Sequence, residues 1–326
     1  MNARLILRLT AQAATCFALT QPLAAFAAFP ERPLQMVIPF PAGGATDVLG
    51  RLVAAELGNR LGQTVVVENR AGAGTSIGAG YVAKAKPDGY TLMLTSTTTF
   101  TVNPAIYKNL PYDPTTSYDA IGQVGSTGLM LLANKDAPAK DLKSFVAQAK
   151  AEPGKVFYGS FGSGTTAHFA AEMLASAAGI TLTHVPYKGS SPAMTDLIGG
   201  QIPYSVDTTA AAIPQVKAGA VRAIVTTAPT RSALLPDVPT AAESGYPDAK
   251  MDTWLAVVGP RGLPADARAT LEKALAEIVA DPAFQKKMAE NGFEPDYANG
   301  AAVDARIQRD VPVMKALADK ARIQID

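Results

Sequence analysis

One pattern recurs along this chain and limits what it can fold into: a short apolar run, a turn rich in glycine or hydroxyl side chains, and then a helical apolar face. In the first copy, Met36–Ile38 predicts a buried strand, and Gly43 and Gly44 predict a turn before a helix. Strands that alternate with helices in this way are typical of a parallel α/β sheet. Each turn leaves backbone N–H groups at a helix start, where they favour an anion. An ordinary turn that binds nothing explains the first copy equally well.

The pattern places polar stretches at the carboxyl ends of the predicted strands, where open α/β sheets bind their ligands. Glycine lets the backbone approach a ligand closely, and hydroxyl groups both donate and accept hydrogen bonds. We therefore expect one cleft that holds a small carboxylate, lined by five stretches: Phe40–Asp47, Thr95–Thr99, Gly159–Thr166, Pro186–Ser191 and Asp207–Thr209. Lys188 is the one cation among them, and a solvated lysine in a turn is the preferred interpretation of it.

The first 27 residues have the features of a secretory signal peptide. Arg4 and Arg8 precede an apolar stretch, and residues 25–27 form a small-residue cleavage site. The only cysteine, Cys16, lies in this segment, so we expect a mature chain without disulfides or thiolate ligands. Without the segment, 27 basic residues face 28 acidic ones, and no basic stripe favours nucleic acid. No later segment is apolar for about 18 residues, so we expect no membrane insertion.

Two breaks in the sequence predict two domains. Residues 125–128 separate two apolar runs, and the proline-rich stretch 235–240 resembles a return linker. We therefore expect a first domain made of residues 28–125 and 235–326 and a second domain made of residues 126–234. Two linkers would then form a hinge, which suits closure of the domains around a ligand.

Several segments occur together, and in the same order, in a known family: Ile38–Gly44 with Asp47 and Arg51, Val67–Gly74, Pro87–Leu92, Asn103–Pro104, Leu110–Pro114, Ser160–His168, His184–Gly189, and Pro236–Thr240 with Glu243 and Gly245. Each is weak alone, but together they are specific and span nearly all of the mature chain. The chain thus resembles the periplasmic solute-binding receptors of the tripartite tricarboxylate transporter family, also called Bug-type receptors. One departure is Ser76, where many relatives have a different small or polar residue.

The resemblance implies an α/β fold of the type II periplasmic-binding-protein class, with two doubly wound α/β domains joined by a two-linker hinge. It implies a monomeric periplasmic receptor, without catalysis, cofactor or metal, that binds a small carboxylate and delivers it to a membrane permease. Together with the strand-end argument it gives the candidate ligand-binding residues Phe40, Pro41, Ala42, Gly43, Gly44, Asp47, Thr95, Ser96, Thr97, Ser160, Gly162, Ser163, Gly164, Thr165, Thr166, His168, Tyr187, Asp207 and Thr208.

A secreted serine hydrolase that uses Ser76 is the alternative function. Residues 74–78 match the G-x-S-x-G pattern, although so short a pattern recurs by chance in a glycine-rich chain. His168 and Glu172 are four residues apart and could form half of a metal site, but no second pair accompanies them, so a hydrogen-bonded histidine is preferred. Trp254 could touch ligand, although packing is the commoner role of such an aromatic side chain.

Overall fold

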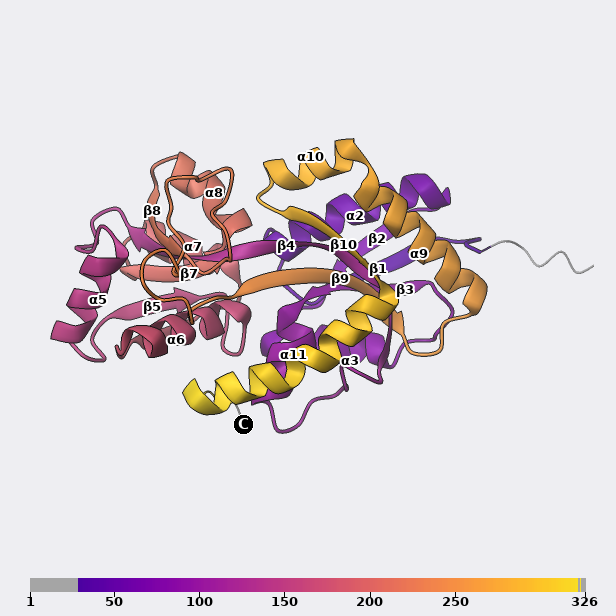
Figure 1. The fold of residues 1–326 in the computed structure, drawn as a ribbon. Helices are drawn as coiled ribbons and strands as arrows, with labels where there is room; N and C mark the ends of the chain where they lie inside the picture. Colours follow the sequence, from indigo (N-terminus) through magenta and orange to yellow (C-terminus); the bar gives the residue numbers. More distant parts are fainter. Residues whose placement is uncertain (1–28, 322, 324–326) are drawn as a thin grey trace, which may run out of the picture.

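The structure, a computed structural model, describes residues 29–321 and 323. The predicted signal peptide, residues 1–27, lies outside these residues. Within the described residues, ten strands form one mixed sheet in which β2, β1, β3, β9, β4, β7, β5 and β6 are neighbours in that order, while β8 and β10 each pair with β4 (Figure 1). We call the part built on β1, β2 and β3 the first lobe and the part built on β5, β6 and β7 the second lobe.

In the first lobe, three parallel strands and one antiparallel strand form the sheet: β1 (Leu34–Ile38), β2 (Val65–Asn69), β3 (Thr91–Ser96) and β9 (Asp252–Pro260). The helices are α2 (Ala45–Leu61), α3 (Ser76–Ala83), α9 (Ala265–Ala280) and α10 (Pro282–Glu290). Met36 and Ile38 of β1 pack into one core with α2, whereas Val37 packs into another core with α3. A strand buried on both faces reads as a continuous apolar run, which is why the sequence predicts β1 well.

The second lobe repeats this arrangement. Its strands are β5 (Phe157–Ser160), β6 (Thr183–Pro186), β7 (Tyr204–Thr208) and β8 (Val221–Thr226). Its helices are α5 (Leu142–Ala151), α6 (Thr166–Ala178), α7 (Ser190–Ile198) and α8 (Thr209–Lys217). Phe145, Tyr158 and Tyr204 are fully buried in its core. Both lobes are therefore α/β units, as the sequence predicts, and most of their helices follow a strand end, whereas α10 follows α9 directly.

A single strand, β4 (Tyr118–Asn134), passes from the first lobe into the second. Its first part pairs with β9 as far as Gly128, and from Leu129 onward it pairs with β7 and β8. Residues 125–128, which the sequence analysis takes as the passage between the two domains, thus lie inside one continuous strand, and the domain boundary predicted there stays a prediction. Gly125 marks a close approach, because a Cβ there would lie 2.5 Å from the backbone oxygen of Glu294 in β10 (Glu294–Asn299). The sequence did not predict β10.

The stretch that follows β8 packs on the second lobe. Leu235 and Val238 join Met130 and Leu132 in one core, and Met251 joins the core that contains Tyr158. The chain then runs back through β9, which starts at Asp252. The predicted domain division stays a prediction, and we propose that the second crossing lies at about residue 252 rather than at residue 235.

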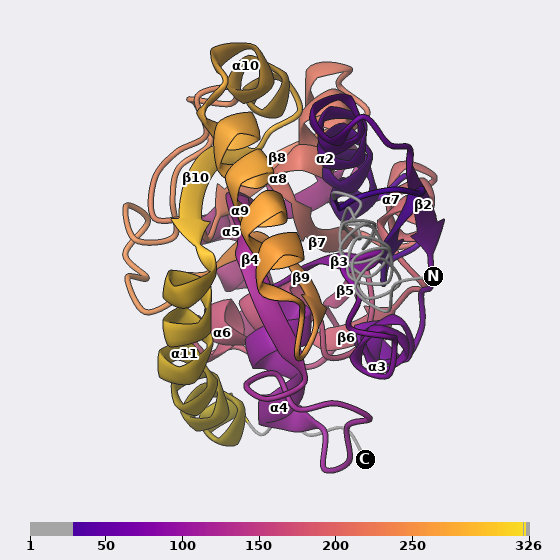
Figure 2. The same cartoon turned by 90° about the vertical axis from the view of Figure 1, so that its right-hand side faces the viewer.

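The last helix, α11 (Gly300–Ala321), lies along both lobes (Figures 1 and 2). Val303 and Ile307 pack into a first-lobe core, whereas Ala318 packs into the second-lobe core. Pro312 lies within α11 between these two contact regions. No helix within the described residues combines the length and the apolarity that crossing a membrane requires.

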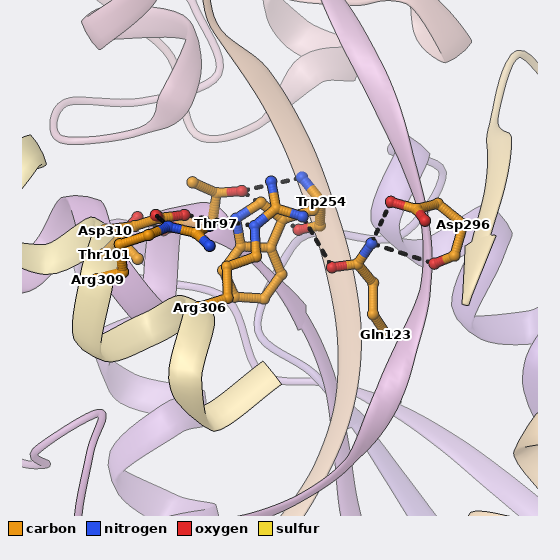
Figure 3. Close-up of polar contacts among 8 residues, drawn as sticks. All are labelled: Thr97, Thr101, Gln123, Trp254, Asp296, Arg306, Arg309 and Asp310. Carbon is orange, nitrogen blue, oxygen red and sulfur yellow. Dashed lines mark hydrogen bonds and ion pairs between the residues drawn. The ribbon is translucent and has the colours of Figure 1, made fainter. Parts of the chain in front are cut away.

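A polar network fixes α11 to the crossing strands (Figure 3). Arg306 of α11 lies over the Trp254 ring of β9, 4.8 Å from its centroid, and donates to Gln123 Oε1 of β4 at 2.9 Å. Gln123 Nε2 donates to Asp296 Oδ2 of β10 at 2.6 Å. Thr97 Oγ1 accepts a hydrogen bond from the backbone N–H of Trp254 at 2.9 Å. These contacts join four elements where the chain passes between the lobes.

Candidate functional site

Two walls, one from each lobe, enclose a cavity of about 480 Å³, the main cavity. The first-lobe wall consists of Pro39–Pro41, Ala71–Thr75 and Tyr107, and the second-lobe wall consists of Phe161–Ser163, Thr165 and Tyr187–Gly189. Most of these residues follow the carboxyl ends of β1, β2, β5 and β6. The cavity therefore lies where open α/β sheets bind ligands.

A narrow waist of about 30 Å³ adjoins the main cavity and contains the buried Asp207. It is lined by Phe40, Pro41, Gly44, Ala45, Thr46, Phe161, Gly189, Ser190, Asp207 and Thr208. Beyond it lies a rear cavity of about 390 Å³, which shares Ala45 and Ser190 with the waist and includes Gly43. The three spaces follow one another between the lobes.

The two walls touch each other around these spaces. A Cβ on Gly189, which has a φ of +122°, would lie 2.7 Å from Pro41 Cγ of the opposite lobe. The Thr166 N–H of α6 donates to Thr98 Oγ1 of the first lobe at 3.2 Å. Glycine at position 189 therefore permits both the backbone conformation and the close approach of the lobes.

Asp207 accepts hydrogen bonds at the waist from Ser190 Oγ at 2.5 Å, from the Thr208 N–H at 2.7 Å and, more weakly, from Thr208 Oγ1 at 3.4 Å. Burial disfavours the charged form and raises the pKa of Asp207 to about 6. Its carboxyl group is the one acidic group among the residues that line the main cavity and the waist. Lys188 is the one basic residue among these lining residues, and it is exposed, so its contact with a ligand stays a prediction.

Asp47 lies behind the first turn rather than in the cleft. Its carboxylate accepts from the Gly43 N–H at 2.9 Å, from Arg51 Nε at 3.0 Å and from Asn69 Nδ2 at 2.8 Å. Burial opposes ionisation, but the hydrogen bonds from Arg51, Gly43 and Asn69 outweigh it and lower the pKa of Asp47. The structure thus gives Asp47 the role of holding the turn. Ala42 of the same turn is exposed and lines none of the three spaces.

The predicted candidates Thr95, Ser96 and Thr97 also point away from the cleft. Thr95 Oγ1 lies 2.5 Å from Thr99 Oγ1, and Ser96 Oγ accepts from the Thr98 N–H at 3.4 Å. All three residues are buried, and none lines the three spaces. The chain continues directly into the π-helical turn η2 (Thr98–Val102), which directs these hydroxyl groups into the protein interior.

The second-lobe candidates divide into a cavity wall and its support. Gly162, Ser163, Thr165 and Tyr187 line the main cavity. Ser160, Gly164, Thr166 and His168 lie behind this wall: Ser160 Oγ accepts from the Gly162 N–H at 3.1 Å, the Gly164 N–H donates to His168 Nδ1 at 3.2 Å, and Thr166 Oγ1 accepts from Thr253 Oγ1 at 3.0 Å.

Two stacked histidines support this wall. The rings of His168 and His184 lie 4.1 Å apart, and His184 Nε2 lies 2.7 Å from Ser160 Oγ. Burial lowers the pKa of His168 to about 4 and that of His184 to about 3. A neutral imidazole can accept a hydrogen bond, so His168 can hold the Gly164 N–H.

Most of the cavity-lining residues that the candidate set missed follow the same strand-end rule. Ala71–Thr75 comes after β2 and lines the main cavity, and its glycines are a signal that the rule could have used. Lys188 and Gly189 lie in a stretch that the sequence predicted to line the cleft, although they were left out of the candidate set. Tyr107, which follows the short helix α4 (Asn103–Ile106), has no such signal.

A serine hydrolase needs a general base beside its nucleophile, and within the described residues no such base contacts Ser76. Ser76 Oγ is buried and has no hydrogen-bond partner in the part of the chain that the structure describes. His184 contacts Ser160 instead, and His168 contacts Gly164. Glu172 accepts from Tyr158 OH at 2.8 Å, and the described residues contain no cluster of three or more potential metal ligands.

Comparisons with known proteins show the family and the fold of this chain. Residues 49–322 match the family model of the tripartite tricarboxylate transporter family receptor. The chain is 38% identical to the periplasmic binding protein BugD, with a TM-score of 0.86, over 91% of this chain and 99% of BugD. It is 31% identical to an R. palustris protein solved with adipate, Rpa4515, with a TM-score of 0.88, over 91% of this chain and 99% of that protein. It is 29% identical to MatC of Rhodopseudomonas palustris, solved with bound malate, with a TM-score of 0.83, over 89% of this chain and 99% of MatC.

Proposed function

This chain belongs to the tripartite tricarboxylate transporter receptor family, and we propose that it captures a small carboxylate in the main cavity and delivers it to a membrane permease. The observation that carries the proposal is the convergence of three helix starts on the cleft. The N-cap residues Gly44 of α2, Thr165 of α6 and Gly189 of α7 line the waist or the main cavity, and none makes a side-chain capping hydrogen bond. Helix starts attract anions.

The charges around the cleft favour a carboxylate that also carries a proton donor. Lys188 supplies a positive charge to the main cavity, and backbone N–H groups supply hydrogen bonds. Asp207, with its carboxyl group at the waist, is placed to accept a hydrogen bond from a ligand hydroxyl or ammonium group. We therefore propose hydroxy or amino dicarboxylates as the preferred class, and the malate-bound and adipate-bound relatives support a dicarboxylate.

We propose that the receptor works as a monomer in the periplasm and reaches a permease of the same transporter class with its cleft closed. Membership of the receptor family supports this and also supports a role without catalysis. Serine-dependent turnover of an ester, lost in a Ser76→Ala variant, would contradict that role.

A thermal-shift screen with malate, aspartate, citrate and adipate tests the proposed function. A ligand at 100 times its Kd adds about 2.7 kcal/mol to the free energy of unfolding, so a true ligand is easy to detect. Lys188→Met should weaken the response, because it removes an exposed charge worth about 0.5 to 1 kcal/mol, whereas Lys155→Met on the same lobe should not. A flat response to a broad panel of carboxylic acids would contradict the proposal.

A further inference from the structure

The segment Ala73–Thr75 forms part of the first-lobe wall in a conformation that side chains oppose. The φ angles are +46° at Ala73, +56° at Gly74 and +86° at Thr75. Ala73 and Thr75 are the only residues other than glycine with a positive φ in the described part of the chain. L-residues adopt this left-handed region at a cost in free energy, so other contacts must hold the segment there.

Asn103 supplies those contacts from beneath the segment. Its side-chain nitrogen Nδ2 donates to Gly74 O at 2.6 Å and lies 3.0 Å from Thr75 Oγ1. Asn103 is fully buried at the start of α4 and does not line the main cavity. It therefore acts on the wall only through the segment that it holds.

The same amide belongs to a chain of buried polar groups in the first lobe. Asn103 Nδ2 also lies 3.1 Å from Tyr112 OH, which donates to Thr99 O at 2.8 Å. Thr75 Oγ1 lies 2.8 Å from Thr99 Oγ1. This chain connects the strained segment to η2 and so to the protein interior, and it explains why the Thr75 hydroxyl points inward.

We propose that Asn103 is a positioning residue for ligand capture, because its amide holds Ala73–Thr75 in the left-handed conformation that shapes the first-lobe wall. The requirement is for a donor at the Nδ2 position, since Gly74 O and Thr75 Oγ1 both face it. A leucine of similar shape has no donor, so the segment would relax toward negative φ and the wall would change. The link to capture rests on the proposed function, whereas the link to the segment does not.

Hydrogen exchange tests the structural part of this proposal without any ligand. The Thr75 N–H donates to Gly72 O and the Ser76 N–H donates to Ala73 O, so both amides report on the segment. Asn103→Leu should make them exchange at least tenfold faster while the β1 amides stay unchanged. Adding Ala73→Gly should restore part of the protection, because glycine adopts positive φ freely. Ala71→Gly, in the same loop but without a positive φ, is the matched control and should restore nothing.

Titration with malate tests the functional part. Asn103→Leu should weaken malate binding at least tenfold, and Ala73→Gly, but not Ala71→Gly, should recover part of it. The proposal would be overturned if Asn103→Leu left the exchange rates unchanged. It would also be overturned if Ala73→Gly and Ala71→Gly restored protection or malate affinity equally. If Asn103→Leu does not fold, Thr75→Val keeps the β-branched shape, removes the hydroxyl and should show a smaller loss of protection. If the native protein binds no carboxylate, the proposed function fails, while the exchange measurement still decides the role of Asn103.

Discussion

At the scale of single residues, Asp207 places a buried carboxyl group at the waist of a cleft that we propose for anions. Because burial raises its pKa to about 6, its charge changes within an accessible pH range. As pH falls through about 6, Asp207 becomes neutral and repels a dicarboxylate less. A neutral Asp207 also attracts a ligand ammonium group less.

When the pH falls from 7.5 to 6, the affinity of the native protein for adipate should therefore rise more than that of the Asp207→Asn variant. Over the same interval, the affinity of the native protein for aspartate should fall more than that of the variant. Asn keeps groups that can bond to Ser190 and to the Thr208 N–H, so the variant serves as a control for protonation of the ligand itself. Calorimetric titration at the two pH values measures both effects. Parallel pH profiles of the native protein and the variant would remove Asp207 from the site.

The buried histidines predict how stability depends on pH. The pKa of His168 is about 4 in the folded protein and about 6.5 in an unfolded chain, so the unfolded state binds more protons between these values. The free energy of unfolding should therefore fall as pH drops from 6.5 to 4, by up to about 3 kcal/mol for this group. Its stabilising contribution is complete above pH 6.5.

Urea unfolding of His168→Asn at pH 7 and pH 4.5 measures this term, because the Asn oxygen can still accept from the Gly164 N–H and does not titrate. The variant should lose less stability than the native protein over this interval. An equal loss in both proteins would show that His168 does not titrate in this range.

At the scale of elements, the same glycine signal in the sequence corresponds to two different local structures. Gly43 and Gly44 follow β1 and form a turn, as predicted, because the strand before them is apolar and the helix after them is amphipathic. Gly125 has the same signal but lies within β4, where the backbone of β10 leaves no space for a side chain. A linear sequence does not show which distant strand lies against a glycine.

Gly125→Ala should therefore destabilise the protein by about 2 to 3 kcal/mol or more, since its Cβ would meet Glu294 O at 2.5 Å and Met288 Cε at 2.6 Å. Gly199→Ala, at a helix end with a φ of −73°, is the matched control and should cost much less, because its Cβ would come no closer than 3.3 Å, to Thr195 O. Chemical denaturation compares the two. A Gly125→Ala variant as stable as the control would show that β10 does not pack closely against β4.

The candidate site was predictable to the level of loops but not of side chains. Strand ends predicted the walls, since Phe40, Gly162 and Asp207 all reach the cleft. Thr95 and Asp47 have the same composition signal but face inward, because η2 and Asn69 lie beside them. Which way a polar side chain turns depends on partners that are distant in the sequence.

At the scale of the whole molecule, we propose that ligand capture depends on how closely the two lobes approach each other. Gly189→Ala should weaken carboxylate binding at least tenfold, because its Cβ would lie 2.7 Å from Pro41 of the opposite lobe. Gly200→Ala is the control, since Gly200 also has a positive φ, +74°, but its Cβ would meet nothing closer than 3.8 Å. Titration of both variants with malate separates lobe approach from backbone strain. Equal losses in the two variants would assign the effect to strain.

The most direct test of the account is a crystal structure of the protein with the carboxylate that gives the largest thermal shift. We expect that carboxylate between the two walls, within hydrogen-bond distance of backbone N–H groups from both lobes and near Lys188 and Asp207. A carboxylate bound outside the main cavity and the waist, or held by one lobe alone, would contradict the account.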